Sequence, residues 1–67
     1  MNKVLGYRKM LNKTQREIAE LIGVSEQTFR NKEKGKVSFK KEEMVKFKNF
    51  LEESGLHDVT IEKIFFE

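Results

Sequence analysis

The spacing of apolar residues along this chain predicts a series of short helices. Met44, Phe47 and Leu51, for example, recur at intervals of three and four residues, which places them on one face of a helix. Similar spacing gives five expected helices, over about 2–11, 15–22, 26–34, 40–53 and 61–65. Because the chain contains no proline to interrupt these segments, we expect an all-α domain.

The segment 14–35 predicts two helices joined by a tight turn. Thr14 and Glu17 have the spacing of a capping box, so a helix should begin after Thr14. Gly23 can adopt the left-handed conformation that ends this helix, and Ser25 is suited to capping the next one. Two helices joined in this way form a helix-turn-helix, which can present its second helix to the major groove of DNA.

The last residues allow two interpretations. Thr60 can cap a short helix over 61–65, whose apolar residues then close the core. The segment 59–66 also contains β-branched and aromatic residues in partial alternation, which is typical of a strand. We prefer the helix, and the alternative is four helices followed by a C-terminal β-strand.

Charge is distributed unevenly along the chain. Residues 1–51 carry 13 lysines and arginines against 6 acids, whereas residues 52–67 carry one lysine against five acids. Four lysines lie within eight residues at the end of the helix-turn-helix: Lys34, Lys36, Lys40 and Lys41. A basic patch beside a helix that can enter a DNA groove is the pattern expected for phosphate binding.

Length and composition exclude several classes of protein. With 67 residues, the chain should form one domain, 1–67, whose helix-turn-helix covers about 14–35. It has no cysteine, and therefore neither a disulfide nor a thiolate metal site. No apolar run reaches the length of about 18 residues that a membrane span needs, and the N-terminus does not resemble a signal peptide. We therefore expect a cytoplasmic protein.

Candidate catalytic groups are few. His57 is the single histidine and lies beside Asp58, as is typical of a surface position. The paired glutamates at 42–43 and 52–53 should lie on solvated helix faces, and the isolated glycines form no phosphate-binding loop. We therefore expect no enzymatic activity, no metal site and no cofactor.

The helix-turn-helix resembles that of the XRE family and, within it, of lambdoid phage repressors and Cro proteins. The matching residues are Gln15, Ala19, Gly23, Val24, Ser25, Phe29, Glu33, Lys34 and Gly35. The resemblance extends to Arg8, to 39–51 and to 61–66, and it implies a compact five-helix, lambda-repressor-like bundle. One departure is Lys32, where the family usually has an apolar residue, and we expect Phe39 to fill that space.

The resemblance places five polar residues on the exposed face of the helix 26–34, where they can read base edges: Glu26, Gln27, Thr28, Arg30 and Asn31. The amides of Gln27 and Asn31 suit adenine, and Arg30 can bind guanine or a phosphate. Glu26 can accept a hydrogen bond from cytosine, but as an i,i+4 neighbour it is better suited to orienting Arg30. Thr28 can touch a thymine methyl group or simply lie on the surface.

Other residues should bind phosphate or hold the helices together. The expected phosphate contacts are Gln15, Arg16, Lys34, Lys36, Ser38 and Lys40. The family position of Gln15 implies this role, and free N–H groups at a helix N-terminus favour an anion. In relatives, residues at the positions of Arg8 and Glu33 form an ion pair between the first and third helices, so we expect a structural role for these two.

A DNA-binding domain with one recognition helix contacts only a few base pairs, and relatives bind two half-sites as dimers. The tail 56–67 provides a candidate dimerisation surface: Leu56, Val59, Ile64 and Phe66. The chain leaves no room for a ligand-binding domain, so we expect no small-molecule ligand. Our interpretation is a phage Cro-like transcriptional repressor that binds a double-stranded DNA operator as a homodimer. The alternative is a protein-binding helix-turn-helix, such as an antitoxin or anti-repressor.

Overall fold

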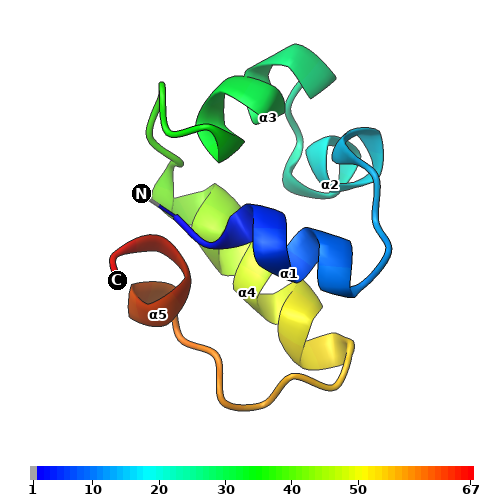
Figure 1. Ribbon diagram of the computed structural model, residues 1–67, viewed down its shortest axis with the longest axis vertical. Coiled ribbons are helices and arrows are strands. Elements are labelled where there is room, and N and C mark those ends of the chain that lie inside the picture. The colour runs from blue at the N-terminus through cyan, green and yellow to red at the C-terminus, as the bar shows by residue number, and fades with distance from the viewer. Residues whose placement is uncertain (1) are drawn as a thin grey trace.

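The structure, a computed structural model that describes residues 2–67, consists of helices and loops, with no strand in that range. The five helices are α1 Val4–Met10, α2 Gln15–Ile22, α3 Glu26–Glu33, α4 Lys41–Glu53 and α5 Ile61–Phe65 (Figure 1). The all-α class and the five-helix order are therefore confirmed, and the alternative C-terminal strand is wrong. Of the expected domain 1–67, Met1 lies outside the described residues.

The ends of the helices follow from local chemistry. Glu17 N donates to Thr14 Oγ1 at 3.0 Å and Thr14 N donates to Glu17 Oε1 at 2.9 Å, which completes the expected capping box. Gly23 ends α2 with a φ of 82°, a conformation that glycine adopts without steric cost. The helix α1 begins later than expected because the Asn2 side chain accepts from Val4 N at 3.0 Å and turns the chain there.

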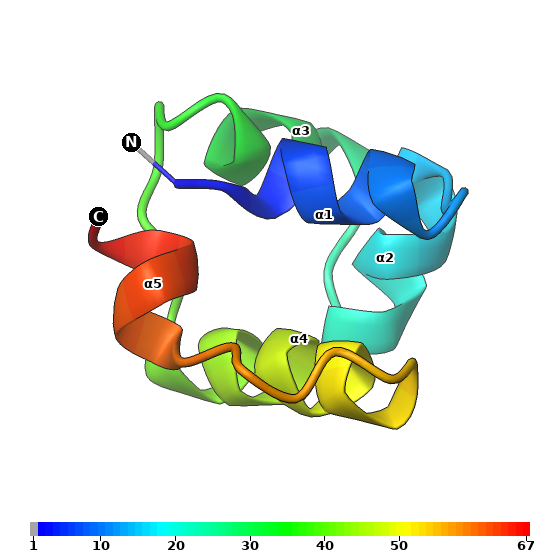
Figure 2. The ribbon, with the colours of Figure 1, turned by 60° about the horizontal axis from the view of Figure 1, so that its bottom comes forward.

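The helices surround one core. Figure 2 shows α1 and α3 on one side, α4 on the opposite side, and α2 and α5 closing the two ends. Phe29 from α3 and Phe47 from α4 are almost fully buried inside. Phe39, which precedes α4, packs edge-on against Phe29 and Phe65, with ring centroids 6.3 and 5.1 Å away. Aromatic packing therefore joins α3, α4 and the tail, and fixes where α3 sits.

The tail completes this core. Lys3 N donates to Ile64 O at 2.8 Å, so the two ends of the chain are tied together. Ile64 is fully buried and Val59 is 8% exposed. The expectation that these two residues form a dimer surface is therefore wrong, because their side chains pack inside their own chain. Leu56 is half-buried and Phe66 is 67% exposed, so both retain surface area.

The departure at Lys32 is accommodated by a buried ion pair. Lys32 Nζ lies 2.6 Å from Glu43 Oε1, and the two residues are 4% and 6% exposed. The expectation that Glu43 lies on a solvated face is therefore wrong. Glu43 Oε1 also accepts from Lys40 N at 2.9 Å, so one carboxylate holds the start of α4 against the end of α3.

Within residues 2–67, no helix combines the length and the apolar character that crossing a membrane requires.

Candidate nucleic-acid interface

The helix α3 has one buried and one accessible face. Phe29 is fully buried, whereas Gln27 is exposed and Asn31 is half-buried. Gln27 Nε2 donates to Asn31 Oδ1 at 3.4 Å, so the two amides lie one turn apart on the same face. Thr28 is half-buried and bonded to the cap, with 2.9 Å between Ser25 Oγ and Thr28 Oγ1. The accessible face therefore carries amide groups that can both donate and accept.

An ion pair fixes the end of α3 against α1. Arg8 Nε donates to Glu33 Oε2 at 2.7 Å, and Arg8 Nη2 donates to Glu33 Oε1 at 3.4 Å. Arg8 Nη1 also donates to the Lys13 carbonyl at 2.9 Å. Both side chains are buried, so this bidentate pair anchors α3 from its inner side.

Hydrogen bonds continue from this pair to the accessible face. Gln15 Nε2 donates to Glu33 Oε1 at 2.9 Å, and Gln15 Oε1 accepts from Arg30 Nε at 2.9 Å. Arg30 Nη2 then donates to Glu26 Oε2 at 2.8 Å. The side chains of Glu33, Gln15, Arg30 and Glu26 thus form a continuous polar chain, which we call the α3 polar chain. This chain joins Glu33, expected to be structural, to Gln15, expected to bind phosphate, and to two residues expected to read bases, Arg30 and Glu26.

The remaining phosphate candidates lie around this face. Five of them are exposed: Arg16, Lys34, Lys36, Ser38 and Lys40. Arg16 lies in the first turn of α2, and the other four lie in the segment 34–40 that joins α3 to α4 (Figure 1). Gly35 has a φ of 88°, and Lys36 N donates back to Asn31 O at 2.9 Å, so this segment turns sharply beside α3.

Two features of this site were not foreseen from the sequence. One is the hydrogen bond between Gln15 and Arg30, which lie 15 positions apart and meet only because α2 and α3 cross. The other is the ion pair between Lys32 and Glu43. The available signal was a lysine at an otherwise apolar helix position, which indicates that this lysine needs a buried acidic partner but does not indicate which acid provides it.

A match to a known protein family identifies the class of this protein. The model of the helix-turn-helix family HTH_3 matches residues 6–55, which include α1 in large part, α2, α3 and α4. The chain therefore belongs to the XRE-type helix-turn-helix family of DNA-binding regulatory domains. No curated protein and no solved structure matches the chain.

Proposed function

We propose that this protein is a Cro-like transcriptional repressor of phage type, which occludes a promoter by binding its operator as a homodimer. The observation that carries the proposal is the accessible face of α3, where Gln27, Arg30 and Asn31 lie together on a helix braced from behind. A helix held in this way can enter the major groove. Because such a repressor acts on DNA, we propose a cytoplasmic location for it.

Base reading is assigned to the side chains of this face. The amides of Gln27 and Asn31 suit the N6 and N7 atoms of adenine, and Arg30 suits guanine. The bond between Gln27 and Asn31 at 3.4 Å is long, so exchanging it for bonds to a base costs little. Glu26 and Thr28 border these three residues, and Glu26 acts through Arg30, to which it is already bonded.

Phosphate binding is assigned to the exposed cations around the face. Arg16 lies in the first turn of α2, and Lys34, Lys36 and Lys40 lie in the segment 34–40, with the Ser38 hydroxyl group among them. Phosphate contacts from these two segments fix the register of a recognition helix in the groove without reading sequence. Each lysine that neutralises a phosphate adds to the salt dependence of binding.

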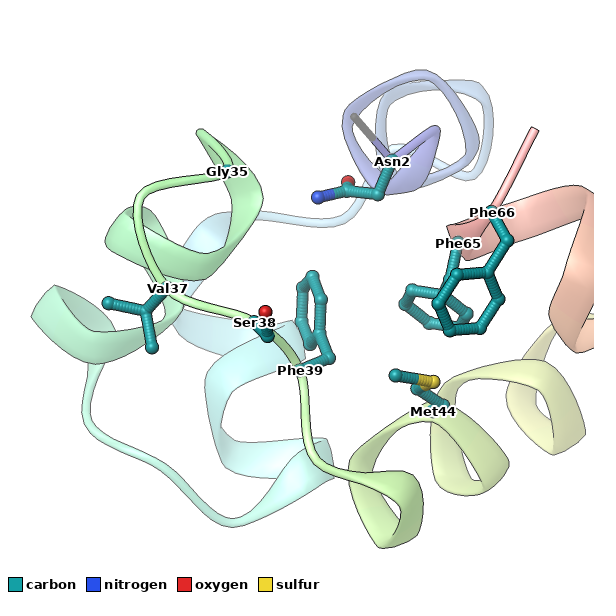
Figure 3. A pocket seen from close by; sticks show the side chains of 8 residues that line it. All are labelled: Asn2, Gly35, Val37, Ser38, Phe39, Met44, Phe65 and Phe66. Carbon is teal, nitrogen blue, oxygen red and sulfur yellow. The ribbon is translucent and has the colours of Figure 1, made fainter.

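A second copy of the chain is the proposed partner on DNA. A hollow of about 130 Å³ lies between the segment 35–39 and the tail. Figure 3 shows Phe39, Met44 and Phe65 facing this hollow, with the exposed ring of Phe66 at its rim. An apolar cavity of about 150 Å³ can hold a benzene molecule, so this hollow is close to the size of one aromatic ring.

Two features of the hollow favour a second copy as its occupant. The protruding ring and the hollow adjoin each other, so a two-fold axis lets Phe66 of each copy enter the hollow of the other. The charges also favour this contact, because the tail 52–67 carries five acids against one lysine, whereas the rest of the chain is basic. Leu56 remains a peripheral candidate for this interface.

Selection of random duplex DNA by the purified protein, followed by sequencing, tests the proposal. A Cro-like repressor should enrich a pseudo-palindromic motif whose half-sites are about one helical turn, or 34 Å, apart. Recovery of single half-sites would contradict dimeric binding. Recovery of no motif would contradict DNA reading and favour the protein-binding antitoxin or anti-repressor class.

A further inference from the structure

The amide group of Gln15 is held in one orientation. Its Nε2 atom donates to Glu33 Oε1 at 2.9 Å, and Arg8 bonds the same carboxylate. An ionised carboxylate only accepts hydrogen bonds, so Glu33 selects the NH₂ end of the amide. The carbonyl end, Oε1, must then face Arg30, whose Nε donates to it at 2.9 Å. If the amide were flipped, its oxygen would face the Glu33 carboxylate, so that two acceptors would meet. Its NH₂ group would then face the Nε–H of Arg30, so that two donors would meet.

The guanidinium group of Arg30 is held along one side. Gln15 accepts from Nε and Glu26 accepts from Nη2, the two nitrogens of the same edge. Among residues 2–67, no group accepts from Nη1. The end of the planar guanidinium, formed by Nη1 and the second hydrogen of Nη2, is therefore available. Two parallel donors at this end are what the O6 and N7 atoms of guanine accept.

The local charge favours guanine over phosphate as the acceptor. Glu26 balances the charge of Arg30, and their side chains are 39% and 44% exposed, so both lie at the accessible surface. A phosphate placed there would also approach the carboxylate of Glu26 and be repelled by it. Guanine presents neutral acceptors with only partial negative charge, so the carboxylate of Glu26 repels them much less than it repels a phosphate.

We infer that Gln15 is a positioning residue, which transmits the fixed orientation of Glu33 to Arg30 and presents the free end of Arg30 to guanine. This inference rests on the proposed reading of DNA by α3. It replaces the phosphate contact expected of the Gln15 side chain with a role in specificity. The backbone N–H groups that open α2 stay available to a phosphate.

A double-mutant cycle on the selected duplex tests this role. Arg30→Ala should lose roughly 5- to 150-fold discrimination at one G·C pair. Gln15→Met keeps the shape of the side chain without its amide, and it should lose at least about twofold discrimination at that same pair. In the Arg30→Ala background, Gln15→Met should have no further effect. A Gln15→Met loss that is equal on every duplex and persists without Arg30 would overturn the inference.

A measurement on the free protein separates this inference from the proposed function. In NMR spectra, the Nε–H of Arg30 should exchange with water more slowly in the wild type than in Gln15→Met. Equal exchange rates would overturn the inference, whatever the protein binds. A wild type that selects no motif would overturn the proposed function, and the NMR comparison would still decide whether Gln15 holds Arg30.

Neighbouring variants serve as controls for these measurements. Arg16→Met changes an exposed residue of the same turn and should weaken binding to all duplexes alike, with a smaller salt slope. Thermal melts of each variant check that the domain is folded. If Gln15→Met prevents folding, Gln15→Ala repeats the cycle and the same two outcomes apply.

Discussion

Lys32 Nζ lies 2.6 Å from Glu43 Oε1 in a buried ion pair that joins the end of α3 to the start of α4. The carboxylate also accepts from Lys40 N, which begins the turn into α4. Both ends of the segment 34–40 are therefore held by neighbouring groups, and this segment carries four of the proposed phosphate contacts. The pair replaces the apolar contact that relatives are expected to have here, so it adds to the contacts that hold α3 against α4.

Breaking this pair should be costly, whereas replacing both partners should not. Lys32→Met leaves the Glu43 charge buried without its partner, and we expect the free energy of unfolding to fall by about 3–5 kcal/mol. The double variant Lys32→Met/Glu43→Gln removes both charges and keeps an oxygen for Lys40 N, so it should recover most of that loss. Urea denaturation of the two variants checks this. Equal losses in both would show that the ion pair is not the cause.

The same carboxylate should make stability depend on pH. Burial raises the pKa of Glu43, but the hydrogen bonds from Lys32 and from the Lys40 backbone, with the charges of both lysines, lower the pKa more, so it lies below its ordinary value. The stability that this carboxylate contributes is complete above the unfolded pKa, about 4.3, and is lost as the pH falls through the folded pKa. The Thr14 backbone also lowers the pKa of Glu17, which adds in the same direction.

Thermal melts between about pH 3 and pH 7 measure this effect. In the wild type, the melting temperature should fall on acidification below about pH 4.3, and Glu43→Gln should show a smaller fall over the same range. Glu42→Gln, which changes the exposed neighbour, is the matched control. A Glu43→Gln profile parallel to that of the wild type would contradict the role given to this carboxylate.

Specificity should depend on Gln27. Because its exposed amide is expected to meet a base edge, Gln27→Ala should weaken binding to the selected duplex by about 1–3 kcal/mol and relax preference at one base pair. Competition binding with duplexes changed at single positions measures this. Asn49→Ala removes an exposed amide from α4, on the far side of the core, and is the control. An equal loss on all duplexes would move Gln27 to the phosphate-binding class.

Salt dependence should identify the lysines that meet phosphate. Lys34→Ala and Lys36→Ala should each flatten the slope of log K against log salt concentration by about 1, without changing the preferred sequence. Titrations from low to moderate salt measure the slopes. Lys48→Ala provides a control on α4, where the lysine pairs with Glu52 at 3.5 Å. Slopes equal to that of the wild type would show that Lys34 and Lys36 do not bind phosphate and are ordinary surface charges.

Adjacent phenylalanines in the tail should have separate effects. Phe65 is 7% exposed, so Phe65→Ala should lower the free energy of unfolding by about 3–5 kcal/mol. Phe66 is 67% exposed, so Phe66→Ala should leave the melting temperature nearly unchanged and weaken dimerisation and operator binding. Sedimentation and thermal melts distinguish the two. A Phe66→Ala variant that dimerises like the wild type would remove the hollow from the proposed interface.

The sequence alone determined features that depend on neighbouring residues. The capping box of Thr14 and Glu17 and the left-handed Gly23 predicted the limits of α2, which the structure confirms. The apolar spacing of Met44, Phe47 and Leu51 predicted the helix α4, which the structure also confirms. These signals are readable because capping, turn conformation and periodicity act over at most a few residues. For the tail, the sequence left helix and strand open and favoured the helix because Thr60 can cap it, and the structure confirms this cap, with Lys63 N donating to the Thr60 hydroxyl oxygen.

Only the tertiary structure decided which polar groups meet across the fold. The ion pair of Lys32 with Glu43 and the bridge from Gln15 to Arg30 join residues that are 11 and 15 positions apart on different helices. Spacing along the chain does not encode such contacts, because they depend on how the helices cross. The structure likewise decided which tail residues remain for a partner, because Val59 and Ile64 are buried in their own chain whereas Phe66 is exposed. Packing therefore makes Gln15, which was expected to bind phosphate, a hydrogen-bond partner of Arg30 on α3.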